Sequence, residues 1–159
     1  MKKLDLISNE LVTLVEEWEP VLTKLSGDTI SIRRNSQNRT IKQILGHIID
    51  SASNNTHRIV HLQYQPSPLI FPNYATFGNN DRWIAIQDYQ NEDWNILIHL
   101  WKYSLLHISH VIKNVKADKL IGVWISGPGE KVTLESMIID FPRHLKLHLS
   151  EISELIKND

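Results

Sequence analysis

Four apolar stripes with the period of a helix constrain the possible fold of this chain more than any other feature of its sequence. In each stripe, apolar residues recur at intervals of three and four, which places them on one face of an α-helix. The stripes predict helices over about residues 6–25, 40–65, 94–115 and 134–155. Helices that are apolar on one face pack those faces together around a shared core. The sequence therefore predicts an all-α fold, a four-helix bundle with a long loop between its second and third helices.

Local signals mark where several of these helices begin and end. Thr40 and Gln43 form a capping box, in which each side chain satisfies a backbone donor of the other residue. Thr133 is the expected N-cap of the last helix. Gly27 is expected to end the first helix. Pro142 lies inside the last stripe and predicts either a kink there or a helix start just before it.

Two long connections separate the helices. Residues 66–90 contain three prolines and exceed the length that a compact bundle ordinarily needs, which predicts a lid or a crossover. Residues 117–132 predict a loop or a short hairpin. Four aromatic residues of the first connection suit a cover for an apolar substrate, or anchors that hold the loop to the core. They are Phe71, Tyr74, Phe77 and Trp83.

Composition narrows the class of protein. A chain of 159 residues, 42% apolar and 22% charged, fits one globular domain over residues 1–159. It has no apolar tract long enough to span a membrane and no signal-peptide pattern, so a cytoplasmic location is expected. A net charge of −1 without a basic block argues against nucleic-acid binding. With no cysteine, any transition-metal site must use imidazole and carboxylate ligands.

Three histidines are candidates for such a site. His144 and His148 are four residues apart, so both imidazoles point to the same side of the last helix. His148 falls inside the apolar stripe of that helix, and His144 lies at its margin. His47 lies at the margin of the second stripe and can supply a third ligand from a distant helix. The alternative is a chance pair of histidines that local hydrogen bonds satisfy.

A polar stripe continues from His47 along the same edge of the second helix. Ser51, Asn54 and Arg58 follow it at offsets of four, seven and eleven residues. Polar side chains at the margin of a core line a cavity or a partner surface, so these three are the predicted pocket-lining residues. Arg58 is also a candidate to hold an anionic substrate group, although a surface salt bridge is the simpler use of an arginine.

Two aspartates stand close to the candidate ligands. Asp50 follows His47 by three residues and Asp140 precedes His144 by four. From there a carboxylate could accept the imidazole N–H that is not used for metal and fix the tautomer. Alternatively, each is an ordinary exposed helix residue. Asp50, Asp140 and Arg58 are the candidate catalytic residues.

The remaining histidines fit the site less well. His57 and His61 also form a pair with a spacing of four, but they lie on the polar back of the second helix. His99, His107 and His110 fall on the side of the third helix opposite its apolar stripe. They are expected to be solvated surface residues.

Two segments carry a family resemblance. The first is Gly-His-Ile-Ile-Asp-Ser-Ala-Ser-Asn-Asn, which begins at Gly46. The second is Asp-Phe-Pro-Arg-His-Leu-Lys-Leu-His-Leu-Ser-Glu-Ile, which begins at Asp140. Over nearly its whole length, the chain resembles the DinB/YfiT-like superfamily of proposed metalloenzymes. The resemblance implies a four-helix bundle with one metal ion on His47, His144 and His148. Members include thiol-dependent S-transferases and hydrolases.

Three functions follow as hypotheses. Three protein ligands leave coordination positions open, which is typical of a catalytic metal. We expect a metal-dependent hydrolase that uses metal-bound water as its nucleophile. The first alternative is a thiol-dependent S-transferase, in which the metal activates a low-molecular-weight thiol. The second is a metal-binding stress-response or interaction module without catalysis.

These hypotheses share one set of partners. The cofactor would be one divalent transition metal, for which zinc, nickel and iron all suit imidazole ligands. The other partner would be a small-molecule substrate, with a low-molecular-weight thiol in the second case. A homodimer is compatible with the sequence, and neither a nucleic acid nor a membrane is expected.

Overall fold

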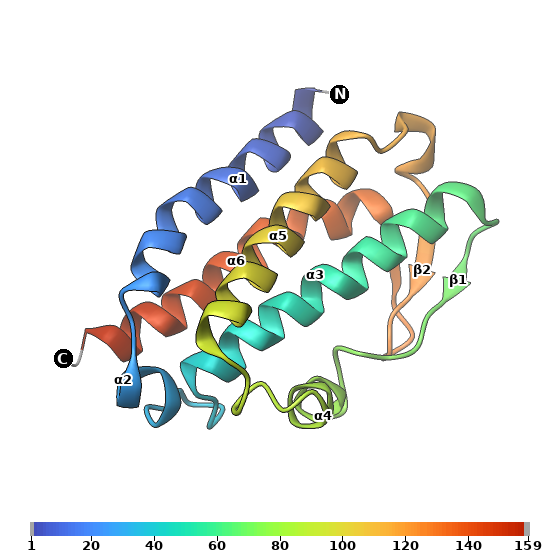
Figure 1. The fold of residues 1–159 in the computed structure, drawn as a ribbon. Coiled ribbons are helices and arrows are strands. Elements are labelled where there is room, and N and C mark those ends of the chain that lie inside the picture. The colour runs from blue at the N-terminus through green and yellow to red at the C-terminus, as the bar shows by residue number, and fades with distance from the viewer. Residues whose placement is uncertain (1, 158–159) are drawn as a thin grey trace.

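The computed structural model describes residues 2–157, and within that range four long helices lie side by side as a bundle (Figure 1). They are α1 (Lys2–Thr23), α3 (Ile41–Tyr64), α5 (Trp94–Lys113) and α6 (Leu134–Ile156). The predicted four-helix bundle is therefore confirmed. The predicted single domain of residues 1–159 also includes residue 1 and residues 158–159, which lie outside the described residues.

Three short helical elements occupy the connections: α2 (Gly27–Ser31), α4 (Asn79–Ile86) and the 3-10 helix η1 (Ala117–Lys119). The predicted role of Gly27 is wrong. α1 already ends at Thr23, and Gly27 opens α2 with a positive φ of 57°. In the described part of the chain, no helix combines the length and apolarity needed to cross a membrane.

The core forms where α5 packs against α1 and α3, while α3 also packs against α6. Trp101 and Leu105 of α5 are completely buried in it. Full burial of a large apolar side chain stabilises the fold by about 1.5–3 kcal/mol. This packing also leaves α3 in contact with α6, and that contact positions the candidate site.

The predicted helix starts of α3 and α6 are confirmed. The hydroxyl of Thr40 accepts a hydrogen bond from the Gln43 backbone N–H, and the Gln43 side chain accepts one from the Thr40 backbone N–H. Thr133 caps α6 by accepting from the Ser136 backbone N–H at 3.1 Å. α6 runs through Pro142, so a helix start just before that proline is ruled out.

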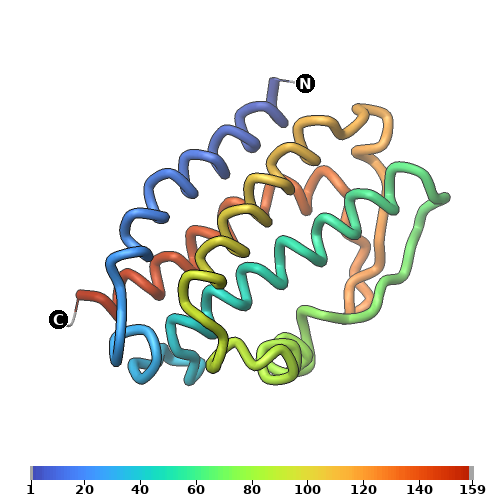
Figure 2. Tube along the Cα trace, viewed as in Figure 1, coloured from blue at the N-terminus to red at the C-terminus, as the bar shows by residue number. Residues whose placement is uncertain are grey.

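A three-stranded sheet closes one end of the bundle. The predicted hairpin in 117–132 is present as β2 (Val123–Ile125) and β3 (Lys131–Thr133), which pair antiparallel. β1 (Leu69–Ile70), from the other long connection, adds parallel to β2, with Leu69 beside Trp124. Figure 2 shows the two connections running next to each other at this sheet. The sheet therefore ties together two loops that are far apart in the sequence.

The remainder of the first connection folds back on α3. α4 is held there by Arg39, which donates to Asp81 of α4, and Tyr89 lies against α3 at Gly46. A Cβ at position 46 would collide with the Tyr89 ring, so only glycine permits this close approach. The connection is thus anchored directly beside His47.

Candidate metal centre

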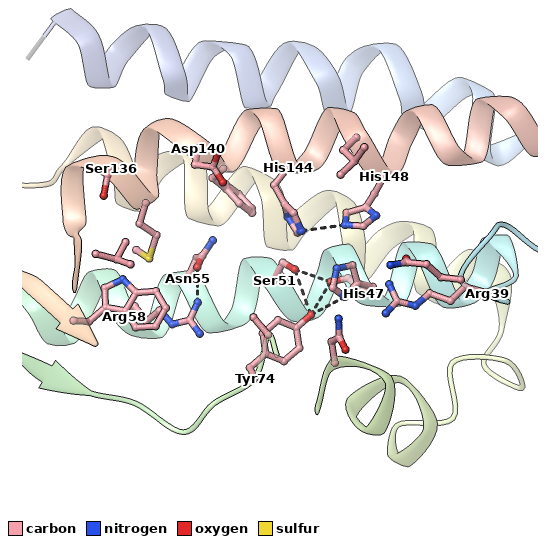
Figure 3. Close-up of a pocket in the computed structure, with 18 residues that line it drawn as sticks. Arg39, His47, Ser51, Asn55, Arg58, Tyr74, Ser136, Asp140, His144 and His148 are labelled. Atoms are coloured by element: carbon pink, nitrogen blue, oxygen red, sulfur yellow. Dashed lines mark hydrogen bonds between the residues drawn. The ribbon is translucent and has the colours of Figure 1, made fainter. Parts of the chain in front are cut away.

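The contact between α3 and α6 brings the three candidate histidines together (Figure 3). One nitrogen from each of His47, His144 and His148 lies within 4.8 Å of the other two. The Nε2 atoms of His144 and His148 are 3.0 Å apart. His47 and His148 are each only 5% exposed, and His144 is half-buried. The three rings therefore converge on one point at the margin of the core.

Two of the rings are oriented by hydrogen bonds on their far side. Nδ1 of His148 donates to Oε2 of Glu151 at 3.0 Å. Nδ1 of His47 pairs with the Tyr74 hydroxyl at 2.9 Å. Because Nδ1 of both rings is engaged on the far side, Nε2 of each ring is left to face the cluster. When Nδ1 carries the proton, the lone pair of Nε2 is free to bind a metal.

The surroundings also keep two of the imidazoles, His47 and His144, neutral. Burial, followed by the charge of His148, lowers the pKa of His47 from its ordinary value to about 2. The same two causes lower the pKa of His144 to about 4, against the opposing effect of Asp140. Only a neutral imidazole can give its lone pair to a metal. At neutral pH these two histidines are therefore in the form that a metal requires.

These observations fit a divalent transition metal. A tetrahedral zinc with bonds of about 2.0–2.1 Å separates its ligand nitrogens by about 3.3 Å, close to the 3.0 Å between His144 and His148. Nitrogen ligands of intermediate softness suit zinc, nickel and iron. His47, His144 and His148 would hold the ion, with Tyr74 and Glu151 as the partners that fix two of the rings.

The cluster forms one part of the wall of a cavity of about 580 Å³. The cavity has polar groups from α3, among them Ser51, Asn55 and Arg58. Asn54, predicted to line this space, instead faces a smaller cavity of about 250 Å³ and donates to the Asp50 carbonyl. The structure thus places Ser51 and Arg58 in the wall of the cavity that the histidine cluster also lines, and leaves Asn54 outside it.

The two aspartates do not orient the histidines as proposed from the sequence. Asp50 is 1% exposed and accepts hydrogen bonds from Tyr89 at 2.6 Å and Gln87 at 2.7 Å. It therefore anchors the loop after α4 and does not reach the His47 ring. Asp140 is exposed at the cavity wall, where Arg143 binds it through Nε at 2.5 Å. Its effect on His144 is through charge alone.

Four residues of the site were missed by sequence reasoning, or assigned another role. Glu151 stands three residues after His148, a spacing that a search for carboxylates on both sides of the pair would have found. Tyr74 was interpreted only as a loop aromatic. Arg39 and Trp124 line the cavity from a helix-flanking loop and from β2, and no local pattern marked either one.

The other histidines lie where the sequence placed them. His57, His99, His107 and His110 are exposed, and His61 is half-buried. The Nε2 atoms of His57 and His61 are 2.9 Å apart, so this pair is formed as well. In the described part of the chain, the cluster around His47 is the only group of three or more histidine and carboxylate side chains that could hold a metal ion.

Comparison with known proteins identifies solved structures that have a similar fold. No protein-family model matches the chain, and no curated protein shows a significant match. The solved structure of YfiT from Bacillus subtilis, described as a probable metal-dependent hydrolase with an unusual four-helix bundle topology, is similar. The identity is 16% over 99% of this chain and 86% of that chain, with a TM-score of 0.79.

A mycothiol-dependent maleylpyruvate isomerase and its histidine-to-alanine variant are also similar in structure. Each shows 11% identity over 94% of this chain, with a TM-score of 0.75. This chain spans 60% of the length of the isomerase. The likenesses show that the chain shares its fold with these two proteins.

Proposed function

We propose that this protein is a metal-dependent enzyme that holds one divalent transition metal on His47, His144 and His148. The observation that carries the proposal is the convergence of three imidazoles on the wall of a large cavity. The metal would supply Lewis acidity, lowering the pKa of whatever water or thiol takes an open coordination position. The cavity has room for a small-molecule substrate beside the cluster.

The favoured reaction is hydrolysis. Asp140 lies at the cavity wall, four residues before His144 on the same face of α6. Hydrogen bonding from Arg143 lowers its pKa, so the carboxylate is ionised at neutral pH and able to accept a proton from a nucleophile. Asp50 is not among the residues that line this cavity, which makes Asp140 the better candidate for general base.

The second candidate is transfer to or through a low-molecular-weight thiol. The observation that favours it is the likeness to an isomerase that depends on mycothiol. The chain has no cysteine of its own, so a thiol nucleophile would have to enter the cavity with the substrate. A homodimer and a cytoplasmic location stay predictions.

Elemental analysis is the first test. Untagged protein is purified without an immobilised-metal column, because a histidine site takes nickel from such a column, and is compared with His47→Ala. About one metal per chain in the wild type, lost in the variant, is the expected result. Wild-type protein that is metal-free and also fails to bind added zinc contradicts the proposal and favours a non-catalytic interaction module.

Activity screens then separate the two reactions. Ester and amide substrates are tested without thiol, and electrophilic substrates are tested with and without a low-molecular-weight thiol. Turnover that needs metal but no thiol supports the hydrolase. Turnover that appears only with the thiol assigns the transferase.

A further inference from the structure

Among the described residues, two buried arginines line the cavity, and only one of them has an ionic partner. Arg39 is 4% exposed and donates through Nε and Nη2 to Oδ1 of Asp81, at 3.0 and 2.8 Å. Arg58 is 7% exposed and has one hydrogen bond, from Nη1 to Oδ1 of Asn55 at 3.0 Å. Within residues 2–157, no carboxylate forms an ion pair with Arg58, and its Nε is buried without a partner.

The neighbours of Arg58 disperse its charge without neutralising it. Its guanidinium lies over the Trp124 ring, 4.2 Å from the centroid, and Asn55 is uncharged. Burial lowers the pKa of Arg58 to about 10, so the side chain is still a cation at neutral pH. A buried charge without a counter-charge is costly, and breaking a buried pair typically costs several kcal/mol. An anion that enters the cavity would relieve this cost.

The other charges at the cavity wall are already compensated. Asp81 neutralises Arg39, and Arg143 neutralises Asp140. The indole N–H of Trp124 is a second buried donor without a partner, next to the guanidinium. At this end the cavity therefore offers a positive charge without a counter-charge, which suits an oxyanion.

The position of Arg58 relative to the histidines sets the shape of a ligand. Asn55, which holds the guanidinium, follows His47 by eight residues, or about 12 Å along the helix axis. Ser51 lies between them on the same wall (Figure 3). A ligand that reaches both ends must be extended, with its anionic group well separated from the group at the histidines.

We propose that Arg58 is the anion subsite of this cavity and binds a carboxylate of an extended substrate. The planar guanidinium can donate two parallel hydrogen bonds to a carboxylate, which favours this anion over a spherical one. The assignment of the far end of the substrate to the histidines rests on the proposed function. The assignment of a carboxylate to Arg58 does not.

The test measures glutarate binding by calorimetry in low-chloride buffer, with protein freed of metal by a chelator. Wild type and Arg82→Gln, which changes an exposed arginine of α4, should bind with the same affinity. Arg58→Gln should lose at least about tenfold, or about 1.4 kcal/mol, and Arg58→Lys should fall between them. Glutarate affinity equal to wild type in both Arg58 variants would overturn the subsite.

Three further measurements keep the outcome unambiguous. Thermal unfolding checks that Arg58→Gln folds, and Arg58→Lys carries the test if it does not. Inorganic phosphate is titrated alongside, and phosphate binding that is tighter than glutarate binding and lost in Arg58→Gln overturns the carboxylate assignment in favour of a phosphate group. Zinc stoichiometry is measured separately, because Arg58→Gln should keep one zinc per chain. If the wild-type protein does not bind zinc but its glutarate binding still depends on Arg58, the proposed function is wrong and the anion subsite stands.

Discussion

The chain contains the same histidine pair twice, in two very different surroundings. His57 and His61 on α3, like His144 and His148 on α6, are four residues apart with Nε2 atoms about 3 Å from each other. His144 and His148, the inner pair, face His47 at the edge of the core. His57 and His61, the outer pair, face the ring of Phe71. Helical spacing is therefore enough to make a pair, and tertiary packing decides whether it gains a third ligand.

The far-side nitrogens differ too. In the inner pair, Nδ1 of His148 is bonded to the carboxylate of Glu151. In the outer pair, Nδ1 of His61 contacts the neutral groups of Tyr64 and Gln65. A carboxylate raises the basicity of a metal-binding imidazole more than a neutral partner does. The comparison predicts that only the inner pair binds metal tightly, and four experiments sharpen or break that prediction.

Removing one histidine from each pair should give the largest difference. We expect His148→Ala to lower zinc affinity by more than about 100-fold, because loss of a ligand exceeds the effect of losing a partner that only orients one. His57→Ala should leave the affinity unchanged. Competition against a chromophoric chelator measures both. Equal losses in the two variants would mean that the pairs share the metal.

Changing the orienting partners should have the next largest effect. Glu151→Gln replaces the carboxylate bonded to Nδ1 of His148 with a neutral amide, and Tyr74→Phe removes the hydroxyl bonded to Nδ1 of His47. We expect each change to lower zinc affinity by about 10–100-fold. Tyr64→Phe makes the matching change at the outer pair and should have no effect. If the inner variants bind zinc like the wild type, the ring orientations are fixed by packing alone.

Acid should destabilise the metal-free protein through His47 and His144. In the unfolded chain they titrate near pH 6.5, while in the fold the pKa of His144 is about 4 and that of His47 is lower still. Below pH 6.5 the unfolded state binds more protons, so stability falls as pH falls, by up to about 1.4 kcal/mol per pH unit for each histidine.

Urea unfolding between pH 7 and pH 4 measures this slope. His47→Gln should make it shallower, because glutamine does not titrate. Bound zinc should move the onset of the loss to lower pH, because protons must then compete with the metal for the same nitrogens. A slope that is the same in His47→Gln and in wild type would contradict the assigned pKa of His47.

Giving the outer pair a third imidazole should have the smallest effect. The Phe71 ring lies 5.7 Å from that of His57 and 5.9 Å from that of His61. In a His148→Ala background, we expect Phe71→His to improve zinc affinity by only about tenfold, because ordering each exposed side chain costs on the order of 1 kcal/mol. Phe71→Leu is the control. Wild-type affinity in the engineered site would show that burial is unnecessary.

Much of the fold was accessible from sequence because its signals are local. The apolar stripes, the Thr40 capping box and the Thr133 cap each depend on residues within one or two turns. The three clustered histidines were found for the same reason, since each sits within or beside a stripe. The parallel pairing of β1 with β2 joins segments about 55 residues apart, and no local pattern specifies it.

The errors at the site have a geometric cause. Successive residues of a helix are rotated by about 100° about its axis. Relative to a line drawn along α3 through His47, Asp50 and Asn54 therefore project to one side, and Ser51 and Asn55 project to the other. The sequence locates the line but does not say on which side the cavity opens. That depends on where α4 packs, and α4 covers the side of Asp50.

The three imidazoles stand on rigid helices, whereas much of the opposite wall comes from connections. Tyr74 belongs to one long connection, and Trp124 and Val132 belong to the small sheet that joins it to the other. Insertions or exchanges in these segments can reshape the chamber while the histidines keep their spacing. In the proposed enzyme this arrangement would separate selectivity from reactivity, so a laboratory seeking a new substrate range should diversify the connections first.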